Sequence, residues 1–247
     1  MIPIRDDSAR RRLSVVSLLL MAISMAVFAM ELKGSASGQL GGVWQTWGLV
    51  GDRFWGSLAA AIREGNPAAA VAWLFFSLPS LWTSLFLHAS FSQILGNLLF
   101  LWAFAPRLEA LWGRGRFLAF YLGCGGLTSG IQAISDPSLA TPLIGANGAI
   151  AAILGAYLVR FPTAKIDSLC PWGLGLVATP LPAWVYGIWW FAQQAFYGIG
   201  RLSADVAVNA WGIGYWAHGF GLLLGAGIAL WGKYRRSIAS SENQGLG

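Results

Sequence analysis

The sequence contains 247 residues, of which 56% are hydrophobic and 11% are charged, and its mean hydropathy is +0.60. Because a soluble domain carries roughly 25% charged residues, this composition excludes an ordinary soluble protein and predicts a polytopic membrane protein. The net charge of +6 comes from basic residues beside the apolar runs. Such residues fix the orientation of membrane helices, so we expect the lipid bilayer, and no nucleic acid, as a partner.

The amino-terminal region predicts a basic tail followed by a membrane span. Residues 1–12 end in three consecutive arginines, and residues 13–32 are apolar over a length that can cross a bilayer. The run ends at Glu31 and not at a small-residue cleavage site, so we expect an uncleaved span. Residues 33–83 mix aromatic residues with Gly, Pro and charges, which is typical of an external loop lying in the membrane interface. Its most apolar run, residues 68–78, is too short to span.

The apolar runs together predict an all-α membrane protein, because irregular backbone cannot face lipid. We expect a bundle of six spans, at residues 13–32, 84–105, 117–135, 143–160, 172–198 and 210–231. Twelve of the 16 basic residues then fall on one side, which places both termini in the cytoplasm. The membrane domain is expected at 13–232, and residues 233–247 are expected to form a cytoplasmic carboxy-terminal tail.

Small residues predict which spans pack most closely. Gly126 and Gly130 form a GxxxG pair in the third span, a spacing that lets helix backbones approach each other. The fourth and sixth spans also carry small residues at helical spacing, and we expect close packing among these three spans. The small residues of the fourth and sixth spans are Gly145, Gly148, Ala217, Gly221 and Gly225.

Polar side chains inside a span are costly and are therefore candidate functional residues. The second span holds His88, Gln93 and Asn97, and the last two share a helix face because they are four residues apart. Asn147 begins the fourth span and His218 lies in the sixth. In the six-span topology all five lie in the outer half of the membrane and could meet at one cavity. Two further amides, expected to form interhelical hydrogen bonds or to lie at the membrane interface, are Gln193 and Gln194.

The two cysteines, Cys124 and Cys170, have neither the spacing of a metal site nor that of a disulfide framework. We expect both to be packing residues and expect no metal and no cofactor. Arg107 and Glu109 follow the second span and are expected to form an ion pair that orders the next loop.

Three stretches carry a family resemblance: "LHASFSQILGNLLFLWAFAPRLEALWGRGRFLAFYL", "GANGAIAAILGAYLVRFPTAKI" and "YWAHGFGLLLGAG". In that order they resemble three spans of the rhomboid family of intramembrane serine proteases. "MIPIRDD" and "LPAWVYGIWWFAQQ" are similar to segments of one bacterial rhomboid subgroup. The resemblance implies a six-helix rhomboid bundle in the bacterial inner membrane. It also implies a serine nucleophile on the fourth span, a histidine base on the sixth and oxyanion donors on the second.

The site departs from the family pattern at two positions. Asn147 stands at the nucleophile position, and Gln93 stands at the second histidine of the oxyanion motif. His218 keeps the base position, and His88 and Asn97 keep the other two oxyanion positions. Phe220 replaces a glycine beside Gly221, which narrows the contact between the fourth and sixth spans.

An asparagine amide cannot replace the attacking hydroxyl, and losing the nucleophile of a serine protease lowers turnover by on the order of 10⁶. The sequence therefore predicts a pseudoprotease that binds transmembrane segments of other membrane proteins or is an accessory subunit of a membrane complex. The alternative is an active protease with a displaced nucleophile. A channel or transporter is less favoured, because the spans hold almost no ionisable residues. The serines considered as replacements are Ser84, Ser90, Ser92 and Ser129.

For Asn147 itself, two interpretations remain open. It could hydrogen-bond to His218 in a polar network with Asn97 that holds three helices together, since interhelical bonds contribute roughly 0.6 kcal/mol each. It could instead contact a ligand or a bound transmembrane segment.

Overall fold

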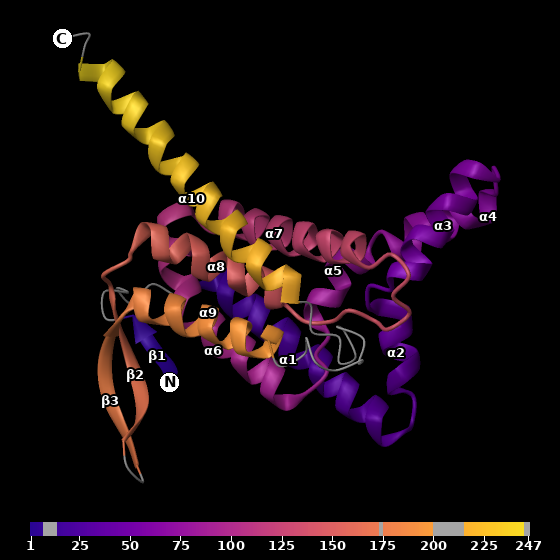
Figure 1. Ribbon diagram of the computed structural model, residues 1–247, viewed down its shortest axis with the longest axis horizontal. Coiled ribbons are helices and arrows are strands. Elements are labelled where there is room, and N and C mark those ends of the chain that lie inside the picture. The colour runs from indigo at the N-terminus through magenta and orange to yellow at the C-terminus, as the bar shows by residue number, and fades with distance from the viewer. Residues whose placement is uncertain (7–13, 173–174, 200–214, 245–247) are drawn as a thin grey trace.

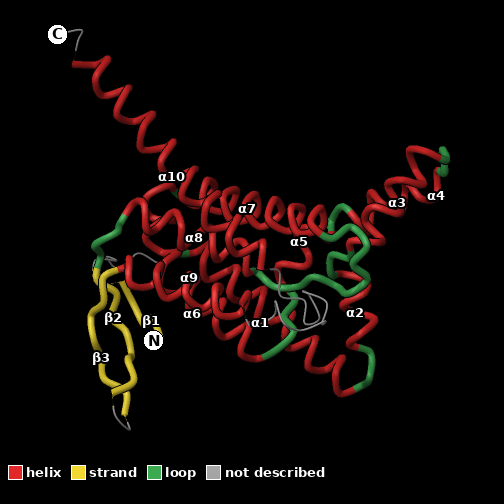
Figure 2. The backbone as a smooth tube through the Cα atoms, viewed as in Figure 1, coloured by secondary structure: helices red, strands yellow, loops and turns green. Residues whose placement is uncertain are grey.

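The computed structural model describes residues 1–6, 14–172, 175–199 and 215–244 (Figure 1). Helices dominate, and the strands are confined to one end of the molecule (Figure 2). The elements are β1 (Ile2–Asp6), α1 (Val15–Ala36), α2 (Leu40–Trp47), α3 (Gly51–Arg63), α4 (Pro67–Ala72), a π turn (Trp73–Ser77), α5 (Ser80–Thr83), a 3-10 turn (Ser84–Phe86), α6 (Phe91–Trp112), α7 (Arg114–Ser135), α8 (Asn147–Arg160), β2 (Lys165–Trp172), β3 (Gly175–Pro182), α9 (Ala183–Ile199) and α10 (Tyr215–Gln244).

Four helical segments in the described part of the chain are long and apolar enough to cross a membrane. Three of them, α1, α6 and α7, correspond to the first three predicted spans. The fourth is Pro67–Phe86, with 20 residues, so the prediction that its apolar run is too short to span is wrong. The run is longer than expected because the π turn, α5 and the 3-10 turn extend α4 without a break in helical character.

The fifth predicted span, residues 172–198, is wrong over its first half. Residues 175–182 form β3, which pairs antiparallel with β2, and helix α9 begins only at Ala183. Proline explains the difference, because Pro180 and Pro182 lack the N–H groups that a helix requires and are tolerated in an edge strand.

The structure also differs from the prediction for the two tails of the chain. The sheet has the order β1-β2-β3, and β1 lies within the region predicted as a basic tail. Asp6 is opposite Ile166 and Ile2 is opposite Leu169 in the β1–β2 register. At the other end of the chain, α10 continues to Gln244 and projects beyond the bundle, so much of the predicted tail 233–247 is helical (Figure 1).

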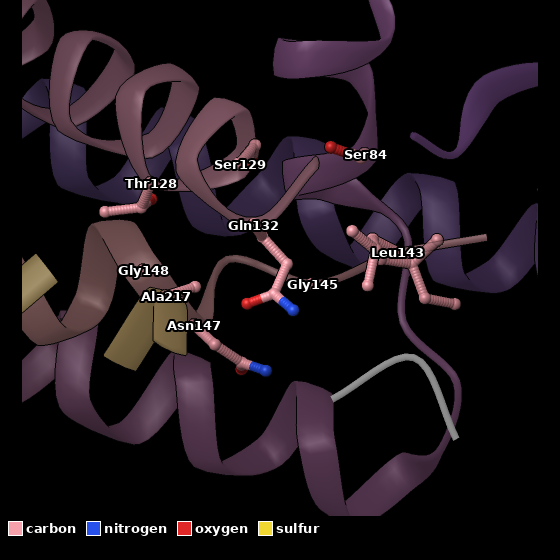
Figure 3. A pocket seen from close by; sticks show the side chains of 10 residues that line it. Ser84, Thr128, Ser129, Gln132, Leu143, Gly145, Asn147, Gly148 and Ala217 are labelled. Carbon is pink, nitrogen blue, oxygen red and sulfur yellow. The ribbon is translucent and has the colours of Figure 1, made fainter. Parts of the chain in front are cut away.

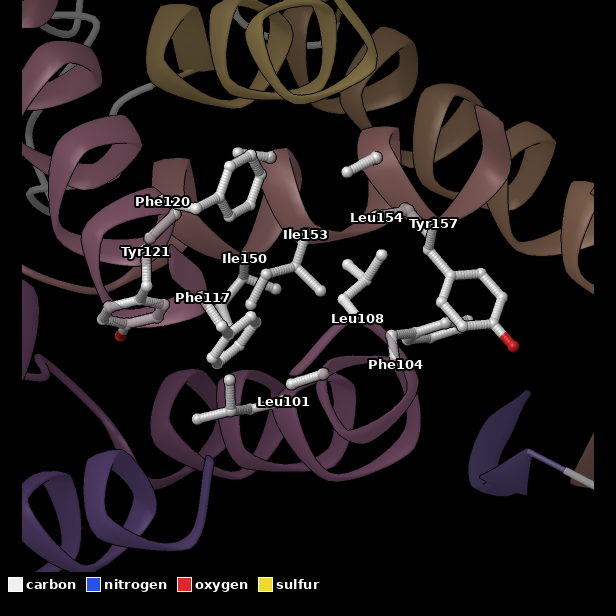
Figure 4. Close-up of a cluster of buried hydrophobic side chains, with 14 of the residues drawn as sticks. Leu101, Phe104, Leu108, Phe117, Phe120, Tyr121, Ile150, Ile153, Leu154 and Tyr157 are labelled. Carbon is white, nitrogen blue, oxygen red and sulfur yellow. The ribbon is translucent and has the colours of Figure 1, made fainter. Parts of the chain in front are cut away.

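Helix α8 is the centre of the bundle, and its residues from Gly148 to Tyr157 are all buried. Figure 4 shows large apolar side chains from α6 and α7 meeting those of α8 in one cluster. Burial on all sides explains why α8 is apolar around its full circumference. The labelled members of the cluster are Leu101, Phe104, Leu108, Phe117, Phe120, Tyr121, Ile150, Ile153, Leu154 and Tyr157.

Glycines permit a close approach of α10 to α8. A Cβ atom added to Gly225 would lie 1.9 Å from the Ala152 carbonyl oxygen, and one added to Gly221 would lie 2.3 Å from the Gly148 carbonyl oxygen. On its other side Gly148 faces α7, where an added Cβ would lie 2.1 Å from Thr128 Oγ1. The three helices therefore touch through backbone and small side chains around the first turn of α8.

The GxxxG pair of α7 faces a different partner. An added Cβ at Gly126 would lie 2.7 Å from Nε1 of Trp82, and one at Gly130 would lie 3.9 Å from Leu81 Cδ2. Both neighbours belong to α5. The close helix approach that this motif predicts thus takes place against the segment between α1 and α6, and not against α8 or α10.

Candidate functional site

Asn147 is the first residue of α8 and follows a loop that is fixed at several points. The Leu143 N–H donates to the Leu49 carbonyl at 2.8 Å, and the Gly145 N–H donates to the Ser84 carbonyl at 2.8 Å. Gly145 has a φ of +112°, which an L side chain rarely adopts, and an added Cβ would lie 2.3 Å from Gln93 Nε2. Glycine at 145 is therefore required both by the backbone and by the space available.

Two cavities lie on either side of Asn147. The smaller has a volume of about 30 Å³ and is enclosed by α7, the loop before α8 and the start of α10. In Figure 3 the amides of Gln132 and Asn147 point into this space from α7 and α8. Its lining residues are Ser84, Thr128, Ser129, Gln132, Leu143, Ile144, Gly145, Asn147, Gly148 and Ala217.

The larger cavity has a volume of about 290 Å³ and lies between α6 and α9. Apolar and aromatic side chains form much of its wall, and three carboxamides add polar groups. Such a mixture of apolar walls with a few polar groups is typical of a binding pocket. Its lining residues are Met1, Ile2, Pro3, Ser92, Gln93, Gly96, Asn97, Leu99, Phe100, Asn147, Trp189 and Trp190.

His218 lies on α10 next to the small cavity. Its neighbour Ala217 lines that cavity, and the imidazole is buried and packs edge-on against Trp190 of α9, with ring centroids 5.5 Å apart. The structure thus brings the base position of the family within the same region as Asn147. The hydrogen bond between Asn147 and His218 stays a prediction.

His88 is held by a chain of hydrogen bonds that begins on α1. The buried carboxylate of Glu31 accepts hydrogen bonds from the His88 backbone N–H at 3.1 Å and from Trp44 Nε1 at 2.6 Å. The His88 Nδ1 atom lies 3.1 Å from the Phe86 carbonyl, and Asn97 Nδ2 lies 3.2 Å from His88 Nε2. Because a carbonyl only accepts, Nδ1 carries the proton and Nε2 accepts from the Asn97 amide.

The electrostatics of His88 agree with this neutral ring. His88 lies between Pro67–Phe86 and α6, outside both apolar segments, and is fully buried. Desolvation lowers the pKa of its imidazole to about 4, because burial disfavours the charged form. At neutral pH His88 is therefore an uncharged link between α1 and Asn97.

Gln93 has a structural role that its position in the family motif does not predict. Its Oε1 atom accepts from the Ala89 N–H at 2.7 Å, and its Nε2 atom donates to the Ile144 carbonyl at 3.1 Å. Ser90 Oγ accepts from the Gln93 N–H at 3.2 Å and caps α6. The side chain therefore connects the start of α6 to the loop before Asn147. The Ser-x-x-Gln spacing, which is that of a capping box, was a sequence signal for the cap at the start of α6 but not for the bond to Ile144.

Of the four serines considered as replacement nucleophiles, Ser84 and Ser129 line the small cavity beside Asn147. Ser90 precedes α6 as its cap, and Ser92, whose hydroxyl is 3.0 Å from that of Ser90, lines the large cavity. The sequence analysis did not predict that the cavities are also lined by Gln132, Trp189 and the first three residues of the chain. The sequence around these residues shows no spacing of polar groups that distinguishes them.

The predicted ion pair between Arg107 and Glu109 is wrong. Arg107 pairs with Asp6 at 3.1 Å, and Glu109 accepts from the backbone N–H groups of Val16 and Ser17 at 3.0 and 2.9 Å. Glu109 thereby caps the start of α1, where unpaired N–H groups favour a negative charge. Arg107 thus holds β1 in place, and Glu109 holds α1.

Two further predictions concern residues that are not covered. The side chains of Gln193 and Gln194 and the start of the sixth predicted span at 210–214 lie outside the described residues. Within the part of the chain that is described, no three His, Cys, Asp or Glu side chains form a group that could hold a metal ion.

Comparison with known proteins identifies the family of this chain. The family model of the rhomboid domain matches residues 76–235. YdcA of Bacillus subtilis, named as a candidate rhomboid protease, is 35% identical over 113 aligned positions, which cover 36% of this chain and 56% of that protein. The presenilin-associated rhomboid-like protein A of Danio rerio mitochondria is 30% identical, covering 47% of this chain and 27% of its own.

Rhomboid protein 1 of Saccharomyces cerevisiae mitochondria is 28% identical, over 65% of this chain and 43% of its own length. The chain thus spans roughly half or less of the curated relatives it matches. The rhomboid model nevertheless covers more than half of this chain, including α6, α7, α8 and α9. The chain is a membrane protein that belongs to the rhomboid family.

Proposed function

We propose that this protein is a catalytically inactive rhomboid of the bacterial inner membrane, which binds transmembrane segments of other membrane proteins or is an accessory subunit of a membrane complex. The observation that carries the proposal is Asn147 at the nucleophile position, beside both cavities. The lone pair of an amide nitrogen is delocalised, so Asn147 cannot attack a peptide carbonyl and form an acyl-enzyme.

The remaining polar residues support the same interpretation. The Gln93 amide donates to the Ile144 carbonyl, and the Asn97 amide donates to His88. Each amide thus uses one of its two N–H groups to hold the site together, and only the other is left to donate to an oxyanion. The six-span bundle of α1, α6, α7, α8, α9 and α10, with both termini cytoplasmic, is part of the proposal; Pro67–Phe86, although long enough to span, then lies in the outer membrane interface with the rest of the loop 33–83.

Binding of a transmembrane segment is supported by the larger cavity. Its wall combines Phe100 and Trp189 with the amides of Asn97 and Asn147. An apolar helix with one or two polar groups would find both an aromatic surface and hydrogen-bonding partners there. None of these contacts requires a nucleophile, so binding can persist where cleavage is lost.

One observation favours the second candidate function, an active protease with a displaced nucleophile. Ser84 and Ser129 line the same small cavity as Asn147, and that cavity begins beside His218. A hydroxyl there would need a hydrogen bond to the base before it could attack.

Activity is tested by incubating the purified protein with a fluorophosphonate probe and with a rhomboid model substrate. We expect neither labelling nor cleavage above the level of a His218→Ala variant. Labelling of the wild type above that level, lost in Ser84→Ala or Ser129→Ala, would establish the displaced nucleophile and overturn the proposal.

Binding is tested with a fluorescent single-span peptide in proteoliposomes. Gly96 lines the large cavity and an added Cβ there meets no atom within 4 Å, so a Gly96→Trp variant should fold and fill the cavity. We expect it to weaken binding by about tenfold through steric conflict. Gly123→Trp is the matched control, because Gly123 on α7 also has open space. Equal binding by the two variants would place the peptide elsewhere.

A further inference from the structure

The large cavity has a wall that comes from the beginning of the chain. Met1, Ile2 and Pro3 line it together with α6, α9 and Asn147. These residues are far from α6 and α9 in the sequence, and no polar pattern marks them for this role. The cavity that would receive a partner is therefore closed partly by the protein's own amino-terminal strand.

Backbone contacts hold β1 in this place. Ile2 is opposite Leu169 and Pro3 is opposite Ser168 in the pairing with β2. On the other edge, Trp102 Nε1 of α6 donates to the Ile4 carbonyl at 2.9 Å. The strand is thus fixed between the hairpin and α6.

A buried ionic contact anchors the end of the strand. The Asp6 side chain is almost fully buried, pairs with Arg107 at 3.1 Å and accepts a hydrogen bond from the Tyr157 hydroxyl. The Arg107 guanidinium also lies 3.9 Å over the ring centre of Phe161. Buried charges are stable only when paired and hydrogen-bonded, so this contact fixes the position of β1 far more strictly than the exposed pair of Arg5 with Asp167.

The other walls of the cavity are held by larger contacts. Phe100 of α6 stacks against Trp190 of α9 with centroids 5.1 Å apart, and Phe104 meets Tyr186 of α9 at 5.5 Å. By contrast, Ile2 of the strand is 39% exposed. Among the walls that the structure describes, β1 is a strand, whereas α6, α8 and α9 are helices of the bundle, so β1 can leave without separating two of these helices.

We propose that residues 1–6 form an autoinhibitory strap, which closes the cavity between α6 and α9 and has to be displaced before a partner segment can enter. The partner, a transmembrane helix, is taken from the proposed function; the strap itself does not depend on it. A 20-residue helix about 10 Å across occupies on the order of 2,000 Å³, and the cavity of about 290 Å³ holds only a few side chains.

Access to the cavity can be measured without any partner. A Gly96→Cys reporter, in a Cys170→Ser background that keeps the buried Cys124, is modified with N-ethylmaleimide in proteoliposomes. The strap is released by Asp6→Ala, and Asp167→Ala, which removes only the exposed pair, is the matched control. We expect Asp6→Ala to raise the modification rate roughly tenfold or more, because breaking a buried charge pair strongly weakens the contact it holds.

A second reporter site and a second variant test whether the effect is specific to the strap and the cavity. A Gly123→Cys reporter on α7, also in open space, should change less than about twofold with Asp6→Ala. Trp102→Phe, which removes one hydrogen bond and keeps most of the ring, should raise Gly96→Cys modification about threefold even if Asp6→Ala does not fold. Equal rates for Asp6→Ala and Asp167→Ala, an equal rise at both reporters, or no effect of Trp102→Phe would overturn the strap.

The outcome is separable from that of the proposed function. If the strap opens but the fluorescent peptide still does not bind, the strap stands and the proposed partner is wrong. If the peptide binds equally well to wild type and to Trp102→Phe, the strap does not control binding.

Discussion

The contact between α8 and α10 gives a prediction whose size follows from the distances. In Gly225→Ala the new Cβ would lie 1.9 Å from the Ala152 carbonyl oxygen, and contacts closer than 3.0 Å essentially never occur. The methyl group must therefore move away by at least 1.1 Å, the difference between these two values. The oxygen is a backbone atom of α8 and the Cβ is bonded directly to the backbone of α10, so the helices themselves have to separate.

The separation affects neighbouring contacts along the same pair of helices. An added Cβ at Gly155 would lie 2.0 Å from the Leu222 carbonyl, which shows that the whole contact is made at backbone distance. Forcing one methyl group into such packing costs about 1–3 kcal/mol. Gly227 is the matched control, because it lies on the same helix with open space around it. Gly227→Ala should be neutral or stabilise by up to about 1 kcal/mol, through the helix propensity of alanine.

The free energy of unfolding can be measured by intrinsic tryptophan fluorescence in mixed micelles with increasing mole fractions of sodium dodecyl sulfate. We expect Gly225→Ala to be less stable than Gly227→Ala by about 1–3 kcal/mol, because the gain in helix propensity is common to both variants. If the two variants unfold at the same mole fraction, α10 does not approach α8 at backbone distance, and the reasoning is refuted.

Three further predictions follow from the hydrogen bonds. Because the pKa of His88 is lowered to about 4 in the folded protein, only the unfolded state protonates this imidazole between pH 6.5 and 4. The free energy of unfolding should therefore fall by up to about 3 kcal/mol as the pH falls through this window. A His88→Gln variant should lose less stability over the same window. Glu109→Gln should destabilise the protein by about 1–2 kcal/mol through loss of the α1 cap, whereas the exposed Glu64→Gln should not, as thermal unfolding in detergent would show. Gln93→Leu should cost about 1–3 kcal/mol by leaving the Ile144 carbonyl unpaired and should speed hydrogen exchange in the loop before α8; unchanged exchange would argue against this role.

The sequence allowed the helices and the position of the site to be predicted where a strong pattern was present. The apolar runs indicated α1, α6 and α7, and polar residues inside apolar runs indicated Asn147, which lies between the two cavities. Both signals are local, since hydropathy and rarity of polar groups can be read within about 20 residues.

Features that depend on contacts between distant residues were not predicted. The pairing of Asp6 with Arg107 could not be predicted, because 101 positions separate the two residues. The residues of β1 had also been predicted to be part of a basic tail. For the same reason Glu109 was assigned to the nearer Arg107 and not to α1. Strand β3 was included in the fifth predicted span, although Pro180 and Pro182 argued against a helix there, and β2 fell in the predicted turn before that span.

The two buried carboxylates of α1 and α6 have a consequence for the order in which the chain assembles. Glu109, near the end of α6, binds the first turn of α1, and Glu31, near the end of α1, binds the residue His88 just before α6. The two helices are thus joined at both ends, and a shift of one along the other would break both contacts. The first of these bonds joins residues 93 positions apart. Helix α1 is synthesised first, but its register in the membrane can be fixed only after α6 has been made.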